Sequence, residues 1–153
     1  MTEDAGNPAK AGKIGSSVFP EILPETRAKL DAMCRLRVCG EGQTLVREGE
    51  RADFVGCLLS GILRMQKTLA DGRRNIVGLL VEGDMFARVF DESIQFSIEA
   101  ATDVQFCAFP RAKFEALLLQ SPDLERAVIL NILHELDRAR DWMIILSNQK
   151  ITS

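Results

Sequence analysis

A helical pattern at the end of the chain constrains the fold more than any other feature. Residues 122–153 contain no glycine, and their only proline is the first residue, while apolar residues recur at steps of three and four. This spacing is typical of the seam between two paired helices. We expect a homodimer, because such a stripe needs an apolar partner. The expected interface consists of Ile129, Ile132, Leu136, Ala139, Met143 and Leu146.

Two further properties of this segment bear on its role. It ends at Gln149–Ser153 without a Gly or Pro stop signal, so we expect the sequence to be part of a longer protein. A second apolar set lies beside the dimer stripe and is expected to pack onto the rest of the domain. This set is Leu133, Trp142 and Ile145.

The composition is that of a globular protein with a hydrophobic core, since 46% of the residues are hydrophobic and 27% are charged. A net charge of -3 argues against a nucleic-acid-coating surface within this segment, because that surface must be basic. No apolar run approaches the roughly 20 residues that span a bilayer, and the N-terminus is polar. We therefore expect a cytoplasmic protein with no membrane contact.

The chain divides into three parts that differ in composition and in the spacing of turn residues. Residues 1–17 are small and polar, which predicts a flexible tail. Residues 18–120 are expected to form a β-barrel sensor domain with short flanking helices at Glu25–Met33 and Arg111–Gln120. Closely spaced Gly-containing turns between Cys34 and Pro110 indicate short strands in a sandwich or barrel. Residues 121–153 then form the dimerisation helix.

Two of the strands can be read from their apolar pattern. Leu63–Leu69 alternates as a half-exposed strand does, and Asp71-Gly72 after it predicts a hairpin that extends as far as Arg74. Ile76–Val81 is apolar on both faces, which predicts a central strand. A buried helical segment is the alternative, although its six-residue length favours a strand.

The order of these elements, with three sequence segments, resembles the Crp/Fnr superfamily of bacterial transcription regulators, in particular its oxygen-responsive branch. The segments are Gly61–Phe86, Phe106–Leu118 and Leu136–Ser147. The resemblance implies a mainly β fold with flanking α-helices: a double-stranded β-helix, or jelly roll, of the cyclic-nucleotide-binding type, followed by the long dimerisation helix. It also implies a C-terminal DNA-binding domain, absent here, through which alone DNA and RNA polymerase would be bound.

The resemblance also allows cyclic AMP to be tested as the effector. Relatives that bind it hold the phosphate with a Gly-Glu pair and a later Arg-Ser pair. The matching stretch here begins at Gly83 and contains Arg88, but it has no Lys or Arg between Asp91 and Asp103. Because a buried phosphate needs cationic or N–H partners, the sequence argues against cyclic AMP. Gly83 and Arg88 remain candidate residues of an effector pocket, the alternative for Arg88 being a solvated side chain.

An iron-sulfur cluster is the second sensing group that the resemblance suggests. Cys107 matches one cysteine ligand of the oxygen-responsive relatives, but residues 1–33 contain no cysteine to supply the other three. The sequence therefore argues against a four-cysteine cluster. The alternative for all four cysteines is that they fill the core as small apolar residues, and no disulfide framework is expected. The only histidine, His134, is expected on the solvated side of the helix, which argues against haem.

No catalytic constellation is present, so we do not expect an enzyme. One His in the chain excludes the metal sites of cupin enzymes, and no GxSxG nucleophile motif occurs. The sequence thus predicts the sensor and dimerisation portion of a DNA-binding regulator whose cofactor or ligand is unknown. The alternative is a stand-alone, small-ligand-binding regulatory β-barrel subunit without DNA-binding activity.

Overall fold

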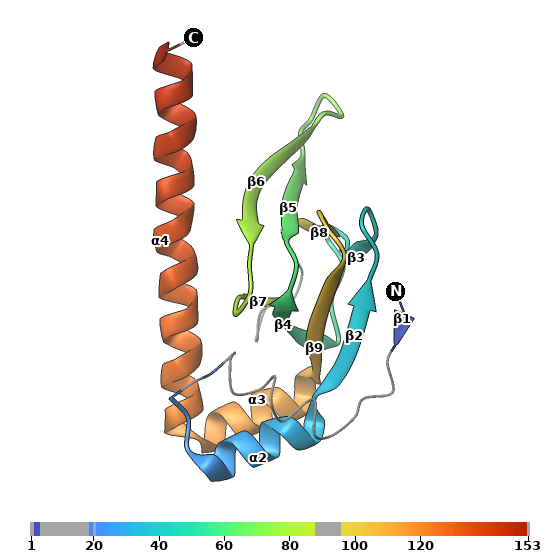
Figure 1. Ribbon diagram of the computed structural model, residues 1–153, viewed down its shortest axis with the longest axis vertical. Helices are drawn as coiled ribbons and strands as arrows, with labels where there is room; N and C mark the ends of the chain where they lie inside the picture. Colours follow the sequence, from blue (N-terminus) through green and yellow to red (C-terminus); the bar gives the residue numbers. More distant parts are fainter. Residues whose placement is uncertain (1, 4–18, 20, 88–95, 153) are drawn as a thin grey trace.

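The computed structural model describes residues 2–3, 19, 21–87 and 96–152, and shows a barrel of short strands beside one long helix (Figure 1). The helices are α2 (Pro24–Met33), α3 (Arg111–Gln120) and α4 (Pro122–Thr152). The strands are β1 (Thr2–Glu3), β2 (Arg35–Cys39), β3 (Thr44–Val46), β4 (Phe54–Ser60), β5 (Leu63–Thr68), β6 (Arg74–Leu80), β7 (Met85–Phe86), β8 (Ser97–Ala100) and β9 (Val104–Pro110).

Two antiparallel sheets make up the barrel. One has the strand order β1-β2-β9-β4-β7 and the other β3-β8-β5-β6, so neighbours in each sheet come from distant parts of the chain. The long-range pairs β2–β9 and β3–β8 join the beginning of the barrel to its end. This topology confirms the mainly β, jelly-roll fold that the sequence predicted.

Apolar side chains lie on both faces of the sheet that contains β9. Between the two sheets they form a cluster in which the rings of Phe54, Phe86 and Phe106 contact one another. On the opposite face a second cluster joins β4 and β9 to the three helices, with Phe109 against Phe114. The strand β9 is thus buried on both sides, and Cys107 on its helix-facing side is fully buried. The molecule has three layers: helices, sheet and sheet.

Prolines mark the starts of two of the predicted helices. Pro24 is the first residue of α2 and Pro122 the first of α4, positions where a missing backbone N–H costs nothing. The predicted helices are confirmed, and their observed ends differ from the predicted ones by at most one residue. The N-terminal stretch is described only at Thr2–Glu3, which pair with β2; the rest of residues 1–17 lies outside the described residues.

The start of α4 is tied to the start of α2 by one carboxylate. Asp123 Oδ2 accepts a hydrogen bond of 2.9 Å from the backbone N–H of Leu23. This bond is the main reason why the pKa of Asp123 lies below its ordinary value, and the Thr26 side chain lowers it further. A carboxylate with a lowered pKa stabilises the fold above its ordinary pKa, and that stability is lost as the pH falls through the lowered value.

We therefore expect Asp123→Asn to lower the free energy of unfolding at pH 7, and expect the difference from the wild type to shrink below about pH 4. Urea unfolding at several pH values measures it. Asp137→Asn is the matched control, because that carboxylate lies exposed on the same helix. A difference that stays constant with pH would show that the charge of Asp123 plays no part.

The β5–β6 hairpin confirms one prediction and corrects another. The predicted hairpin is present, and its turn ends at Arg73, one residue before the expected Arg74, with Leu69 N–H donating to Arg73 C=O. The strand β6, however, is at the edge of its sheet and not at its centre. Its second apolar face includes Ile76 and Leu79, each about 40% exposed. Of these two residues, only Leu79 lines the groove between β6 and α4. Ile76 lies opposite Gln66 of β5.

Candidate functional site

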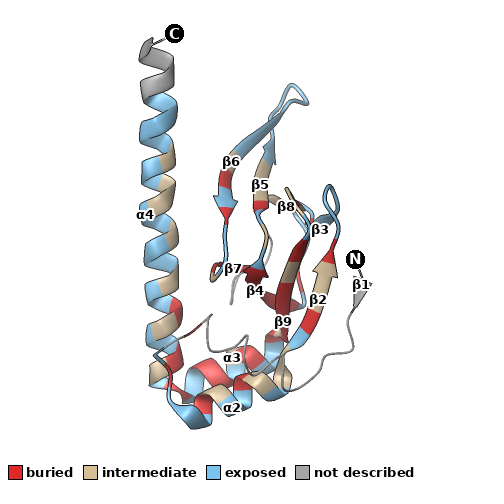
Figure 2. Cartoon of the chain, viewed as in Figure 1, coloured by how far each residue is buried: buried red, intermediate tan, exposed pale blue. Residues whose placement is uncertain are grey.

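The helix α4 leaves the barrel after its first turns and keeps most of its apolar residues exposed (Figure 2). Leu124 and Val128 are buried in the core, but beyond them the predicted dimer stripe is accessible. Within it Met143 is 66% exposed, and Ala139 alone is partly buried. The other members Ile129, Ile132, Leu136 and Leu146 are 36–49% exposed. So much exposed apolar surface on one helix is typical of an interaction site.

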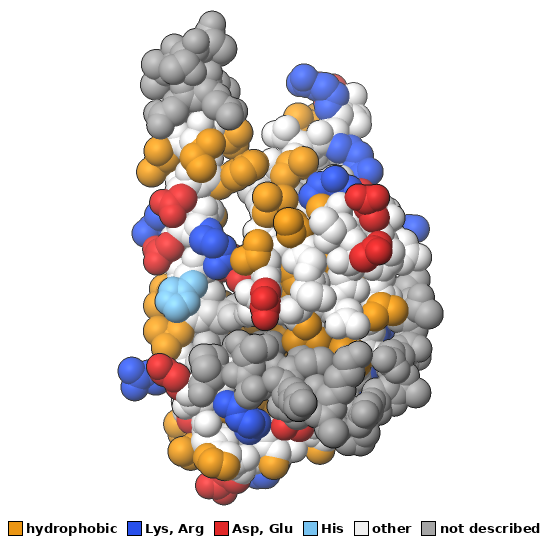
Figure 3. All heavy atoms as spheres, viewed as in Figure 1, with side chains coloured by type: hydrophobic (Ala, Val, Ile, Leu, Met, Phe, Trp, Pro, Cys, Tyr) orange, Lys and Arg blue, Asp and Glu red, His pale blue; other side chains and the backbone are white. Residues whose placement is uncertain are grey.

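A groove of about 620 Å³ separates α4 from β5 and β6. In the space-filling view, hydrophobic side chains gather on both sides of it (Figure 3). The barrel supplies Met65, Leu79, Val81 and Phe96, among others, and α4 supplies residues from Ile132 to Ile145. Trp142 and Ile145 line the groove as predicted, and so do Ile132, Leu136 and Ala139 of the predicted dimer stripe. Leu133 does not line the groove and is 48% exposed, so the prediction that it packs onto the barrel is wrong.

At the lower end of the groove, α4 holds the turn between β6 and β7. Asn131 Nδ2 donates a hydrogen bond of 2.8 Å to Gly83 C=O, and Met85 N–H donates one of 3.2 Å to Asn131 Oδ1. The same turn is bonded to the barrel, because Gly83 N–H donates to Leu58 C=O. The positive φ of +93° at Gly83 lets the chain make this turn without a Cβ clash. The turn therefore connects the sheet with the helix.

An ion pair between a buried carboxylate and a partly exposed arginine strengthens the same connection. Asp84 is only 5% exposed, and its Oδ2 lies 2.5 Å from Arg138 Nη2 of α4 and accepts a hydrogen bond of 2.7 Å from Val81 N–H. A buried carboxylate that lost its cation would be strongly disfavoured, so α4 and the turn are expected to move together. Of the described residues that line the groove, Arg138 is the only cation, and Asp84 already neutralises it.

We expect Asn131→Ala to lower the free energy of unfolding by about 1–3 kcal/mol, because it leaves one backbone C=O and one backbone N–H of the turn unpaired. Urea unfolding measures the change. His134→Ala on the next turn of α4 is the control, since His134 is exposed. Equal stability of the two variants would contradict a role of Asn131 in holding the turn.

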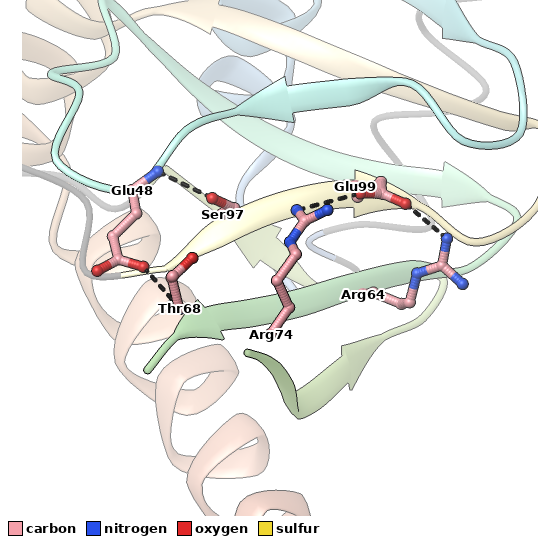
Figure 4. Close-up of polar contacts among 6 residues, drawn as sticks. All are labelled: Glu48, Arg64, Thr68, Arg74, Ser97 and Glu99. Carbon is pink, nitrogen blue, oxygen red and sulfur yellow. Dashed lines mark hydrogen bonds and ion pairs between the residues drawn. The ribbon is translucent and has the colours of Figure 1, made fainter. Parts of the chain in front are cut away.

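The outer face of the β3-β8-β5-β6 sheet is polar and carries its own ion pairs (Figure 4). Glu99 on β8 lies between Arg64, at 2.7 Å, and Arg74, at 3.4 Å. At the end of the sheet, Thr68 N–H donates to Glu48 Oε1 and Glu48 N–H donates to Ser97 Oγ. These contacts tie neighbouring strands together, and the carboxylate of Glu99 offsets the arginines. The face is therefore best explained as the solvated side of the sheet.

The candidate effector residues Gly83 and Arg88 have different outcomes. Gly83 does not line the groove, and it contacts Asn131 of α4 through its backbone C=O. Arg88 lies outside the described residues. His134 is exposed on α4, as predicted for a solvated histidine.

The cysteines require a correction. Cys34 and Cys107 form a disulfide with a Cα–Cα distance of 5.6 Å, whereas the sequence predicted no disulfide. Cys39 and Cys57 are free and buried, in line with the core-filling alternative. In the disulfide, Cys107 has no thiolate to offer a metal. No group of three His, Cys, Asp or Glu suited to a metal occurs in the described part of the chain.

Several residues of the site could not be found from the sequence. Asn131 is a single polar residue in an apolar stretch of α4, and only its position on the barrel-facing side, between Val128 and Trp142, could have singled it out. Nothing in the local sequence distinguishes Asp84 or Arg138 from other charged residues, because the sequence does not show which face of the helix meets the barrel.

Comparison with known proteins agrees with this architecture. Residues 36–121 match the family model described as cyclic nucleotide-binding domain. The transcriptional activator protein FnrL of Cereibacter sphaeroides is 34% identical over 82% of this chain and 50% of its own length. The nitrogen fixation regulation protein FixK of Bradyrhizobium diazoefficiens is 32% identical over 71% and 46%, respectively. The chain thus spans about half the length of these relatives.

Among solved structures, a cyclic nucleotide-binding domain from Methylobacillus flagellatus superposes with a TM-score of 0.74, at 18% identity, over 96% of this chain and 88% of that one. This likeness shows the fold alone. The described residues include no helix with the length and apolar character needed to cross a membrane. From the family match and the relatives together, the chain belongs to the Crp/Fnr superfamily, of which it carries the sensor domain.

Proposed function

We propose that this chain is the sensing and dimerising part of a cytoplasmic, DNA-binding transcription regulator and has no enzymatic activity. The observation that carries the proposal is the pairing of an exposed apolar stripe on α4 with the clamp formed by Asn131, Asp84 and Arg138. The stripe provides a dimer interface, and the clamp transmits changes in the barrel to that interface. The names of FnrL and FixK, a transcriptional activator and a regulation protein, support the same role.

The groove between β6 and α4 is proposed as the place where a signal acts. Its walls are mostly apolar, its one described cation, Arg138, is paired with Asp84, and the carboxylates of Glu135 and Asp141 also line it. A neutral, apolar effector therefore fits it better than a cyclic phosphate. An effector that binds one position of α4 more tightly than another would shift the dimer equilibrium. Gly83 would take part through its backbone bond with Asn131 of α4, and Arg88 remains a candidate for contact with a polar group.

Trp142 offers a direct test of this proposal, because it is the only tryptophan of the chain and it lines the groove. Its indole Nε1 is buried and has no hydrogen-bond partner among the described residues. We expect the neutral fluorescent probe N-phenyl-1-naphthylamine to quench Trp142 by energy transfer and to bind less tightly to Leu79→Lys. If the wild type and Leu79→Lys bound the probe equally tightly, the groove would not be the binding site.

The sequence of the gene beyond codon 153 tests the regulatory role. Sequencing beyond codon 153 is expected to reveal a helix-turn-helix with basic residues, through which DNA and RNA polymerase would be contacted. A stop codon at that point would instead favour a stand-alone regulatory subunit. Sedimentation of the 153-residue chain is expected to show a homodimer.

A further inference from the structure

The disulfide lies where three layers of the molecule meet. Cys34 caps the end of α2, with its backbone N–H donating to Leu30 C=O, and Cys107 lies in the middle of β9. Both belong to the apolar cluster that also contains Leu124 and Val128 at the base of α4. The bond therefore fixes α2 against the sheet at the point where the sheet meets the dimerisation helix.

The two sulfur atoms differ in accessibility. Cys107 is 0% exposed, whereas Cys34 is only partly buried at the edge of the cluster. A small oxidant or reductant therefore reaches Cys34 first. Cys57 lies opposite Cys107 on the neighbouring strand, but burial raises the pKa of its thiol, which keeps it protonated and unreactive. Exchange is thus confined to the pair Cys34 and Cys107.

We propose that Cys34 and Cys107 form a reversible thiol–disulfide site that responds to peroxide and sets the position of α2 against α4. The inference rests on the proposed function for its cellular setting, because disulfides in cytoplasmic proteins are usually transient and serve redox sensing. The link to α4 is structural: α2 is held at its other end by Leu23 N–H on Asp123 of α4. Releasing the disulfide frees one of the two ends of α2.

The reaction balances with peroxide as the oxidant. The Cys34 thiolate attacks one oxygen of hydrogen peroxide, which breaks the O–O bond and gives a sulfenic acid and, with a proton, water. The Cys107 thiol then attacks the Cys34 sulfur, forming the S–S bond and releasing a second water. In the reverse direction a dithiol attacks Cys34, Cys107 leaves as a thiol after taking up a proton, and the dithiol is oxidised to its own disulfide.

The experiment counts thiols in the native 153-residue chain. After dithiothreitol treatment, denaturation and alkylation, mass spectrometry is expected to find four modified cysteines. After hydrogen peroxide it is expected to find two, with a cross-linked peptide joining Cys34 to Cys107. Cys39→Ala should still lose two thiols on oxidation, while Cys34→Ala should lose none. A cross-link to another cysteine, or a bond that dithiothreitol breaks only after unfolding, would overturn the proposal.

A second measurement tests the effect on α4. We expect the dimer dissociation constant to differ between the oxidised and reduced chains by roughly fivefold or more, and Cys34→Ala to remove the difference. Sedimentation velocity over a range of concentrations measures it. Equal dissociation constants for the oxidised and reduced chains would overturn the claim that the disulfide controls dimerisation. Monomers in both states would contradict the proposed dimer as well, while the thiol counts would still decide whether the cysteine pair is reversible.

Discussion

Met143→Glu is expected to convert the dimer into a monomer. Met143 is 66% exposed in the single chain and lies in the apolar stripe of α4, so the substitution leaves the monomer core untouched. Burying one methionine contributes about 1.5–3 kcal/mol, and a two-fold interface loses this twice. The dimer should therefore weaken by roughly 10²-fold to 10⁴-fold, which sedimentation equilibrium measures.

His134→Glu is the matched control for this experiment. It adds the same charge nine residues earlier, which is two and a half turns at about 3.6 residues per turn and hence the opposite face of α4. The control should remain a dimer, and both variants should keep the circular dichroism spectrum of the wild type. If Met143→Glu were still a dimer, the stripe on α4 would not be the interface.

Reducing the Cys34–Cys107 bond is expected to lower the free energy of unfolding by about 4 kcal/mol. The bond joins positions 73 residues apart, and closing a loop of that length removes much of the entropy of the unfolded chain. Guanidinium unfolding of the oxidised chain and of the chain with excess dithiothreitol gives the difference directly, because the two samples have the same sequence.

Cys34→Ala and Cys39→Ala separate the disulfide from the loss of a side chain. The first should show no effect of dithiothreitol, because Cys107 then has no partner. Cys39→Ala should still lose stability in dithiothreitol as the wild type does, because Cys39 is a free thiol. An effect of dithiothreitol that survives in Cys34→Ala would assign the stability to another pair of cysteines.

Local patterns were sufficient to predict the helices and the hairpin. Pro24, Pro122 and Asp71-Gly72 act through the backbone of their own neighbourhood, so a sequence reveals them without knowledge of the fold. The apolar stripe of α4 was equally visible, because its period is that of the helix. Its proposed role still depends on an interface between two chains.

The remaining features depend on contacts between distant residues. The apolar pattern of β6 indicated burial on both faces, but the sequence does not show that one face meets α4 across a groove instead of lying in a sheet centre. The Cys34–Cys107 bond requires the pairing of β2 with β9, and Asn131 gains its role only because α4 passes the turn at Gly83. Each of these features follows from the topology of the barrel.

The edge position of β6 has a consequence for how the chain behaves when α4 is displaced or removed. An edge strand presents unpaired backbone N–H and C=O groups, and here the same strand also carries an apolar face with Ile76 and Leu79. Such an edge is a template for adding a strand from another molecule. The long helix lies beside this edge, in addition to its proposed role in dimerisation. Shortening it is therefore expected to make the protein prone to form β-rich assemblies.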